Sequence, residues 1–488
     1  MSEWGTNIQQ HVKDLRPVSL IVILVVAIGL GWWLKSLHLP TTFKIPGPWY
    51  LKFTNLCVIY VEALGHRREW IHQLHLKYGP VVQIAHNEVS FVSYTAAKQI
   101  YVSGSKDFEK TDFYDIFQQR GHINLFTARD PHVHAKIKKP LADRYSNSNI
   151  LKSKVMDSIA ERAQEFVKQC LATRSADVYL YLHAYALDCV TSMLFHPYNA
   201  HSLDRKHDRD MVHLFSYANV REGNYYFPAL MSVYYAMVPG QQDKRTRGRD
   251  QLRRYMDETL AKSDHSDFTL VSRLKSLEDF PESLTRAECM DHMGAGVETT
   301  GDCLCFLLRE LSQPRSGPIV MSLRRELQTA TSQQDLANLS YLNAVVQEAL
   351  RLWAPGTLTL PRHVPSGGRL IDGYMIPGNI IVGVPSYSLH RLDYAFSEPF
   401  KFIPERWLND EGSVDRQRVF LPFGGGSRQC IGKFLAQAEM RSLLHAVYSR
   451  YRTIPAKDMD ACMDLDDQVL VSRPKGTSCK LEFVPAEA

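Results

Sequence analysis

The stretch Phe423-Gly-Gly-Gly-Ser-Arg-Gln-Cys430-Ile-Gly432 is the most informative part of the chain, because a glycine-rich turn with one cysteine leads directly into 433–450. Helical spacing and strong helix formers predict that 433–450 is a helix. Cys430 then lies at a helix N-terminus, where the helix dipole and free N–H groups stabilise a thiolate. The stretch therefore indicates a metal-binding thiolate, and a glycine-rich turn around a buried free cysteine is the alternative.

The same stretch matches the pattern F-x-x-G-x-R-x-C-x-G, which resembles the signature of the cytochrome P-450 family at every fixed position. The resemblance implies that Cys430 is the axial ligand of the iron in haem b. It also implies that Phe423 shields the sulfur, that Gly424 belongs to the turn, and that Gly432 lets the helix and the macrocycle approach each other. Arg428 is implied to pair with a haem propionate.

The segment Ala295-Gly-Val-Glu-Thr-Thr300 lies inside a helix expected at 285–313, although glycine and β-branched threonine are poor helix formers. A tolerated kink is the simpler explanation. Alternatively, Gly296 loosens the helix and Thr299 competes for the Ala295 carbonyl, which opens a groove. The segment resembles the family's A-G-x-[DE]-T oxygen-activation motif. That resemblance implies a catalytic proton relay with Glu298 as the acid and Thr299 as the alcohol.

Glu348-Ala-Leu-Arg351 places a carboxylate and a guanidinium three residues apart on one face of a helix expected at 340–353. This spacing is common by chance, and most such pairs are surface ion pairs. In the cytochrome P-450 family a buried pair of this kind is joined by an arginine from a P-E-R segment, which Pro404-Glu-Arg406 resembles. The resemblance implies a buried structural trio of Glu348, Arg351 and Arg406 that is costly to break.

Three more basic side chains are candidates for contact with the haem. The segment 130–139 resembles the family's third major helix, in which many members have Trp-x-x-x-Arg where this chain has His134 and Lys138. Lysine binds a propionate as a point charge and lacks the bidentate fork of arginine. Arg362 lies in a segment similar to one that supplies an arginine to a propionate elsewhere in the family. A solvated helix face, or a docking patch for an acidic reductase, is the alternative for the lysines.

The run at 18–34 is uncharged and apolar, and Arg16 and Lys35 bracket it. As a helix it would span about 26 Å, slightly less than the roughly 30 Å hydrocarbon core of a bilayer. A retained anchor is favoured over a buried core helix and over a cleaved secretory signal, which would have a shorter apolar core and a small-x-small cleavage site. We therefore expect a membrane anchor at 1–40 and one catalytic domain at 41–488.

Composition excludes several classes of protein. Of 488 residues, 45% are hydrophobic and 22% are charged, as in an ordinary globular protein. The net charge of +5 comes without a basic run interleaved with aromatics, so no nucleic-acid partner is expected. Nine scattered cysteines do not form a secreted disulfide pattern. A single large domain is therefore expected after the anchor.

Periodicity predicts a mainly α fold with small β-sheets, and the resemblance implies the cytochrome P-450 fold. Helices are expected at 66–77, 132–145, 152–172, 177–195, 246–262, 285–313, 317–329, 340–353 and 433–450, and strands at 81–84, 89–92, 369–371, 380–384 and 480–484.

The resemblance extends over nearly the whole chain and implies a haem-thiolate monooxygenase that inserts one oxygen atom from O2 into a lipophilic small molecule. The reaction would be hydroxylation, epoxidation or further oxidation. Electrons would come from NADPH through a separate cytochrome P-450 reductase, with cytochrome b5 as a second candidate donor. The anchor implies a single-pass protein of the endoplasmic reticulum membrane with a cytosolic catalytic domain. The segments 361–385 and 402–408 look like those of filamentous-fungal members of natural-product pathways.

The same resemblance implies a substrate pocket formed by 108–126, 217–237, 285–299, 354–360 and 465–480. Two other functions remain open at this point. A haem-thiolate isomerase or dehydratase would not use O2, but it has little use for the acid and alcohol at Glu298 and Thr299. A haem sensor or electron carrier has little use for a long aromatic pocket region.

Overall fold

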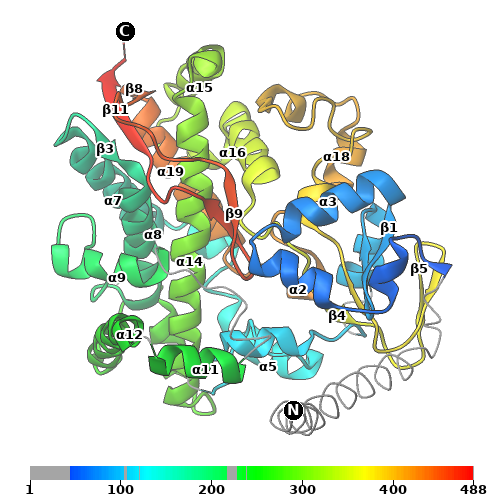
Figure 1. The fold of residues 1–488 in the computed structure, drawn as a ribbon. Coiled ribbons are helices and arrows are strands. Elements are labelled where there is room, and N and C mark those ends of the chain that lie inside the picture. The colour runs from blue at the N-terminus through cyan, green and yellow to red at the C-terminus, as the bar shows by residue number, and fades with distance from the viewer. Residues whose placement is uncertain (1–43, 104–106, 120, 217–227, 238, 487–488) are drawn as a thin grey trace, which may run out of the picture.

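Helix α14 (Glu282–Leu311) runs through the middle of the computed structural model, and the other helices gather around it (Figure 1). The structure describes residues 44–103, 107–119, 121–216, 228–237 and 239–486. The expected anchor at 1–40, with its apolar run at 18–34, lies outside the described residues. So do residues 217–227 of the expected pocket stretch 217–237. Within them, the mainly helical architecture with small sheets is confirmed.

The long helices form where apolar residues recur at helical spacing. Helix α8 packs against α14, and α7 packs against both α8 and α19. The α-helices are α2 (Leu56–Ala63), α3 (Arg67–Tyr78), α4 (Tyr94–Ala97), α5 (Pro131–Leu141), α6 (Asn147–Ile150), α7 (Ser153–Leu171), α8 (Val178–Phe195), α9 (Lys206–Ser216), α11 (Pro228–Met237), α12 (Pro239–Leu260), α13 (Leu270–Lys275), α14, α15 (Gly317–Leu327), α16 (Ser340–Trp353), α17 (Ser386–Leu389), α18 (Ser413–Val419) and α19 (Lys433–Tyr448).

The largest sheet has four strands in the order β1-β2-β7-β4. Strands β1 (Val81–Ala85) and β2 (Glu88–Phe91) are antiparallel, and β7 (Ile381–Gly383) runs parallel to β2. Strand β4 (Arg362–His363) brings the candidate site residue Arg362 to the edge of this sheet. The smaller sheets join β5 (Arg369–Ile371) with β6 (Tyr374–Ile376), β9 (Leu465–Asp467) with β10 (Ser472–Pro474), and β3 (Ala176–Asp177) with β11 (Lys480–Pro485) and β8 (Tyr451–Pro455).

Helix α8 belongs to the core of the molecule. Among the described residues it alone has the length and apolar composition of a membrane span, but 89% of it is buried inside the protein. Its burial is explained by its two neighbours, because α7 and α14 cover it. The close packing of α8 on α14 fixes the central helix that carries Glu298 and Thr299.

The expected trio of Glu348, Arg351 and Arg406 forms a buried network. The Glu348 carboxylate accepts two hydrogen bonds from Arg351, over 2.8 and 2.9 Å, and one from Arg406 over 3.2 Å. The indole N–H of Trp407 and the backbone N–H of Ile403 also donate to it, over 2.9 and 3.0 Å. The side chains of Glu348 and Arg351 are both 0% exposed. A buried carboxylate is stable only with this degree of compensation.

Arg351 extends the network to the loop-rich segment after α17. Its guanidinium also donates to the carbonyls of His390, Pro399 and Lys401, over 3.0, 2.7 and 3.0 Å. His390 in turn accepts from the backbone N–H of Leu421 over 3.0 Å, two residues before Phe423. The network therefore ties α16 to the chain that leads into the cysteine loop.

We expect the substitution Glu348→Gln to lower the free energy of unfolding by about 3 kcal/mol or more, because two buried guanidinium groups lose their counter-charge. Denaturant unfolding measures the change. The matched control is Glu165→Gln, which breaks the exposed pair between Glu165 and Lys168 on α7 and should cost less than about 1 kcal/mol. A Glu348→Gln protein as stable as this control would contradict the structural role.

Candidate functional site

The loop that carries Cys430 is shaped by two glycines in left-handed backbone conformations. Gly424 has a φ of +68° and Gly426 a φ of +64°, and L side chains rarely adopt such values. A Cβ on Gly426 would also clash with the carbonyl of Tyr101. The Cys430 N–H donates to the Phe423 carbonyl over 2.9 Å and closes the loop. The conformation of Gly424 agrees with the turn expected there.

The thiol of Cys430 lies at the N-terminus of α19, where the sequence places it. Burial raises the pKa of this thiol, while the backbone N–H groups of Gly432 and Lys433 and the charge of Lys138 act in the opposite direction. A stable thiolate therefore needs further positive charge, which an iron ion bound to the sulfur would supply. Although protein surrounds the thiol, Cys430 keeps accessible surface. A Cβ on Gly432 would lie 3.8 Å from the sulfur, so a side chain here would crowd that surface.

Five basic side chains from four segments gather beside this loop, and we call them the basic cluster: Lys110, His134, Lys138, Arg362 and Arg428. Burial and then the other four charges lower the pKa of His134 to about 3. Burial and then Arg362 lower the pKa of Arg428 to about 10. Burial, followed by the two arginines, holds the pKa of Lys110 well below its usual value. Like charges crowd in this way around an anionic ligand, and the two propionates of a haem match that requirement.

Arg428 and Lys138 also fasten the cysteine loop to the segment around α5. Arg428 donates to the carbonyls of Ala128 and Arg129, and Lys138 donates to the carbonyl of Ser427 over 2.6 Å. The Nε of Arg428 is buried and has no hydrogen-bond partner among the described residues. The Nε–H of Arg428 can therefore donate a hydrogen bond to an anion, at the position where the sequence predicts a propionate contact.

Sequence reasoning missed two members of the site, Lys110 and Tyr114. Lys110 is 6% exposed, donates to the Phe126 carbonyl, and lies 4.4 Å from the ring centres of Tyr114 and Phe126. The hydroxyl of Tyr114 accepts a hydrogen bond from Arg362 over 2.8 Å. The signal for Lys110 was a lone lysine in the aromatic stretch 108–126, where only an apolar lining was expected.

The middle of α14 differs in one respect from the expectation. Thr299 donates to the Ala295 carbonyl over 2.6 Å, as expected. The helix, however, runs without interruption from Glu282 to Leu311, so Gly296 does not break it. A Cβ on Gly296 would lie 2.9 Å from a methyl group of Val190 on α8. The glycine is therefore explained by the close approach of α8 and not by a loosened helix.

Glu298 has the protonation state that a proton donor needs. Burial and then the neighbouring carboxyl of Asp302 raise the pKa of Glu298 to about 8, and Arg473 opposes the shift. The carboxyl of Glu298 therefore carries its proton at pH 7. On the same face of α14, Ala295 is exposed although the helix runs through the middle of the molecule. This face thus borders a space within the protein and is not packed against another element.

The arrangement fits a haem better than a metal ion held by protein ligands alone. Among the described residues, no three His, Cys, Asp or Glu side chains gather as a metal-ligating group. A haem iron needs only one protein ligand here, and Cys430 offers it. The basic cluster offers counter-charges for the propionates, and the accessible Ala295 offers surface on α14.

Comparison with known proteins agrees with this reading. The family model "Cytochrome P-450" matches residues 46–481. A cytochrome P-450 monooxygenase of Emericella nidulans is 28% identical over 90% of this chain and 87% of its own length. The fusicoccadiene 8-ol C-16 hydroxylase of Alternaria brassicicola is 27% identical over 88% and 91% of the two chains. A cytochrome P-450 monooxygenase of Botryotinia fuckeliana is 29% identical over 88% and 86%.

All three relatives are named as monooxygenases or hydroxylases, which are enzymes that incorporate oxygen. The family match covers most of the chain, including the cysteine loop, the basic cluster and the middle of α14. A protein of this family carries haem. The chain belongs to the cytochrome P-450 family and is a haem-thiolate monooxygenase.

Proposed function

We propose that Cys430 is the axial ligand of the haem iron and that the enzyme inserts one oxygen atom from O2 into a lipophilic small molecule. The observation that carries this proposal is the pairing of Gly432 and Lys433 N–H groups with the Cys430 sulfur beside five basic side chains. Haem, when bound, supplies the activation of O2 by two electrons. A haem-thiolate isomerase is the weaker candidate, because it has little use for a protonated Glu298 next to Thr299.

The basic cluster would hold the propionates. Arg428 and Arg362 supply guanidinium groups, Lys138 and the additional Lys110 supply point charges, and His134 stays neutral and offers a ring. Phe423 would shield the sulfur, with Gly424 and Gly432 giving the macrocycle room. These contacts would fix the orientation of the haem relative to α14.

Glu298 and Thr299 would move protons to the oxygen-binding side. Glu298 holds a proton at pH 7, and the Thr299 hydroxyl donates to the Ala295 carbonyl, so its oxygen is oriented to accept a hydrogen bond from an acid or from water. Both residues lie on the face of α14 that carries the accessible Ala295. Proton supply at this position favours oxygen insertion over release of peroxide.

Electrons would come from NADPH through a separate cytochrome P-450 reductase, with cytochrome b5 as a second candidate donor. A surface cavity of about 390 Å³ beside the cysteine loop is lined by Arg416, Gln429 and Lys433, among others. Positive charge next to Cys430 suits an acidic partner. Docking there would bring the donor close to the sulfur side of the haem.

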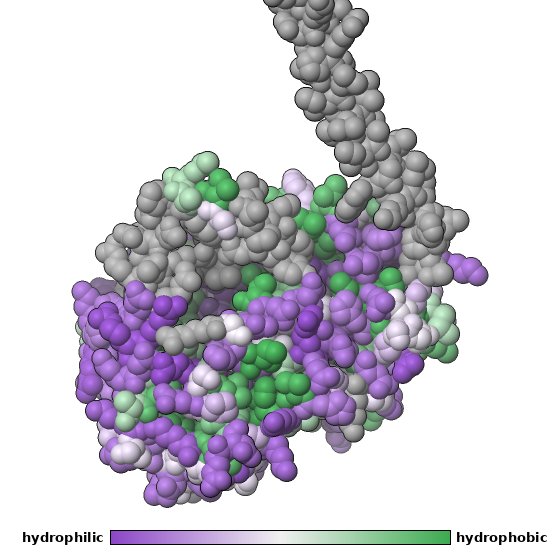
Figure 2. Space-filling view, turned by 90° about the horizontal axis from the view of Figure 1, so that it is seen from below, coloured by the Kyte–Doolittle hydropathy of each residue, from purple (hydrophilic) through white to green (hydrophobic). Residues whose placement is uncertain are grey.

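A membrane anchor at 1–40, with the catalytic domain at 41–488, would place the enzyme on the endoplasmic reticulum membrane as a single-pass protein facing the cytosol. Helix α11 supports contact with a lipid surface, because Val233, Tyr234 and Met237 are 49%, 46% and 75% exposed. Figure 2 views the end of the molecule where α11 and α5 lie and shows hydrophobic patches among hydrophilic residues. A lipophilic substrate could then enter from the bilayer.

The names of the relatives suggest the class of pathway in which this enzyme acts. One is named for hydroxylation of a fusicoccadiene alcohol, and others are fungal monooxygenases. Together with the fungal-type segments at 361–385 and 402–408, they favour oxidation of a natural product in fungal secondary metabolism.

The substitution Cys430→Ser should abolish the thiolate-type Soret band of the reduced, CO-bound protein, because an alcohol is a poor ligand for the iron. Difference spectroscopy measures the band. The matched control is Cys462→Ser, since Cys462 is also exposed and free, and it should keep the band. Retention of the thiolate band in Cys430→Ser would refute the proposed ligand.

Product formed per NADPH should fall as the pH rises through about 8, because Glu298 loses its proton there. Glu298→Gln should lower this ratio roughly tenfold or more at pH 7 and remove the step at pH 8. Parallel assays of NADPH, product and peroxide across pH 6.5 to 9 give the ratio. An unchanged pH profile in the variant would exclude Glu298 as the donor.

A further inference from the structure

Asp291 lies on the same face of α14 as the proposed proton relay. It precedes Ala295 by four residues and Thr299 by eight, and residues spaced by four lie one above another along a helix. Helix α14 therefore presents a carboxyl two turns from Thr299, on the face that borders accessible space at Ala295. Its interaction with Lys110 puts it on the side of α14 that faces the basic cluster.

The Asp291 carboxyl lies inside the protein but forms no hydrogen bond or ion pair with the described residues. The residue nevertheless keeps partly accessible surface. Burial raises the pKa of Asp291 to about 7, and Lys110 opposes the shift. Lys110 directs its ammonium group to the Phe126 carbonyl and to two aromatic rings. Because the carboxyl keeps accessible surface and has no hydrogen bond to the described residues, a ligand that enters this space can reach it.

The segment 108–126, whose Lys110 charge acts on Asp291, is rich in aromatic rings. Phe113 and Phe117, on the 3-10 helix η4 (Asp112–Phe117), meet edge to face at 5.7 Å, and Phe117 meets Phe126 at 5.4 Å. The Leu125 N–H donates to Glu288 over 2.8 Å and so holds this segment against α14, three residues before Asp291.

A cavity of about 210 Å³ opens between the same two elements. Gln119 and His122 line it from the aromatic segment, and Ala287 and Met290 line it from α14. Asp291 itself does not line this cavity, because consecutive residues of a helix point in different directions. The cavity shows that the aromatic segment and α14 are not closely packed along their whole length.

We propose that Asp291 binds a positively charged nitrogen of the substrate and that the neighbouring phenylalanine rings cover the hydrocarbon around it. The proposal deepens the proposed function, on which it rests, by naming the substrate class as a lipophilic amine. A cation is favoured because it compensates a buried carboxylate directly, and ring faces attract it as well. A neutral hydroxyl would offset much less of the free energy that the Asp291 carboxylate loses on desolvation.

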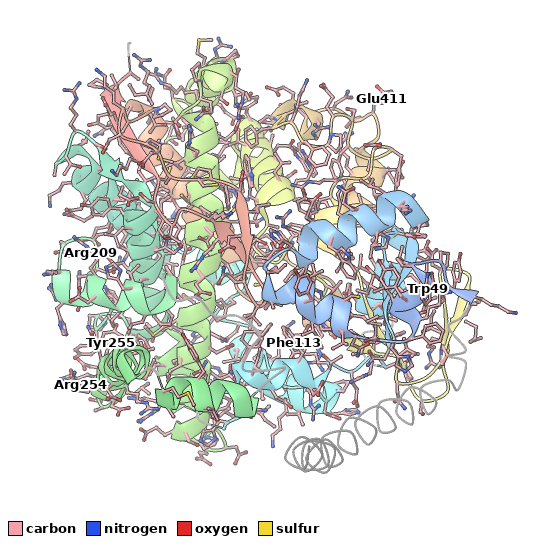
Figure 3. All side chains as sticks on the ribbon, viewed as in Figure 1. Trp49, Phe113, Arg209, Arg254, Tyr255 and Glu411 are labelled. Atoms are coloured by element: carbon pink, nitrogen blue, oxygen red, sulfur yellow. The ribbon has the colours of Figure 1, made fainter. Side chains whose placement is uncertain are left out.

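The test uses the haem-loaded full-length protein and three probes of one shape. Benzyltrimethylammonium is always charged and cannot ligate iron, neopentylbenzene is its neutral carbon analogue, and benzyldimethylcarbinol carries a hydroxyl. Equilibrium dialysis measures each affinity. Asp291→Asn should weaken ammonium binding at pH 8 at least about tenfold and change neopentylbenzene binding less than about twofold. Glu411→Gln, on a surface loop far from α14 in Figure 3, should change neither.

The pH profile of the wild-type protein gives a second measurement that needs no variant. Ammonium affinity should be constant above pH 7 and fall about tenfold for each unit below it, because only the ionised Asp291 attracts the cation. Lys110 and Glu288 also face Asp291, so the step must vanish in Asp291→Asn.

Three results would overturn the proposal: equal losses for all three probes, carbinol binding as sensitive to Asp291 as ammonium binding, or a pH step that persists in the variant. The thiolate band of the CO complex is recorded on every sample. Its loss in the wild-type protein would count against the haem ligand, whereas its retention with unchanged ammonium binding in Asp291→Asn would count against the amine site alone.

Discussion

The proposed haem site depends on one constraint: the sulfur of Cys430 must carry a negative charge although burial disfavours it. Burial alone favours the neutral thiol of Cys430, and the start of α19 and Lys138 only partly offset it. A bound iron would supply the remaining charge, so metal binding and thiolate formation would be coupled. The loop conformation set by Gly424 and Gly426 serves this purpose, because it directs the backbone N–H groups of α19 toward the sulfur.

Buried charges are compensated in different ways at Glu348 and in the basic cluster. The Glu348 carboxylate has its counter-charges in the protein, with Arg351 and Arg406 in direct contact, so that part of the fold is complete without a ligand. The basic cluster holds like charges that depress each other's pKa, and the buried Nε of Arg428 has no partner among the described residues. The Glu348 network therefore needs no ligand, whereas the charges of the basic cluster would be compensated by a bound haem.

Local pattern predicted most of the long helices within a few residues, although α12 begins at Pro239 and not at 246, and α9 and α11 were not predicted. It also put Cys430, Thr299 and Glu348 at positions whose contacts the structure then displays. Cys430 and Thr299 have contacts within one loop or one helix turn, so sequence spacing carries the information. Glu348 also contacts Arg406, 58 residues away, and that contact was expected only from the family resemblance. The role of Lys110 was not predicted, because the other members of the basic cluster come from distant segments of the chain. Arg362, for example, donates a hydrogen bond to Tyr114 and lies 248 residues beyond Tyr114. Gly296 was assigned to the wrong cause for the same reason, since the contact that requires it, Val190, belongs to another helix.

The two faces of helix α14 have different roles. Toward α8 it is packed so closely that side chains at Gly296 and Gly301 would collide with Val190 and His183, which makes the helix a rigid support. On the face with the accessible Ala295 it carries acids whose pKa values are raised by burial, to about 7 at Asp291 and about 8 at Glu298. The Lys110 charge acts on Asp291, whereas a second carboxyl acts on Glu298, so the two acids differ in the ease with which they ionise. A helix held rigid on one side can thus present an anion for binding and a proton for chemistry on the other, one to two turns apart.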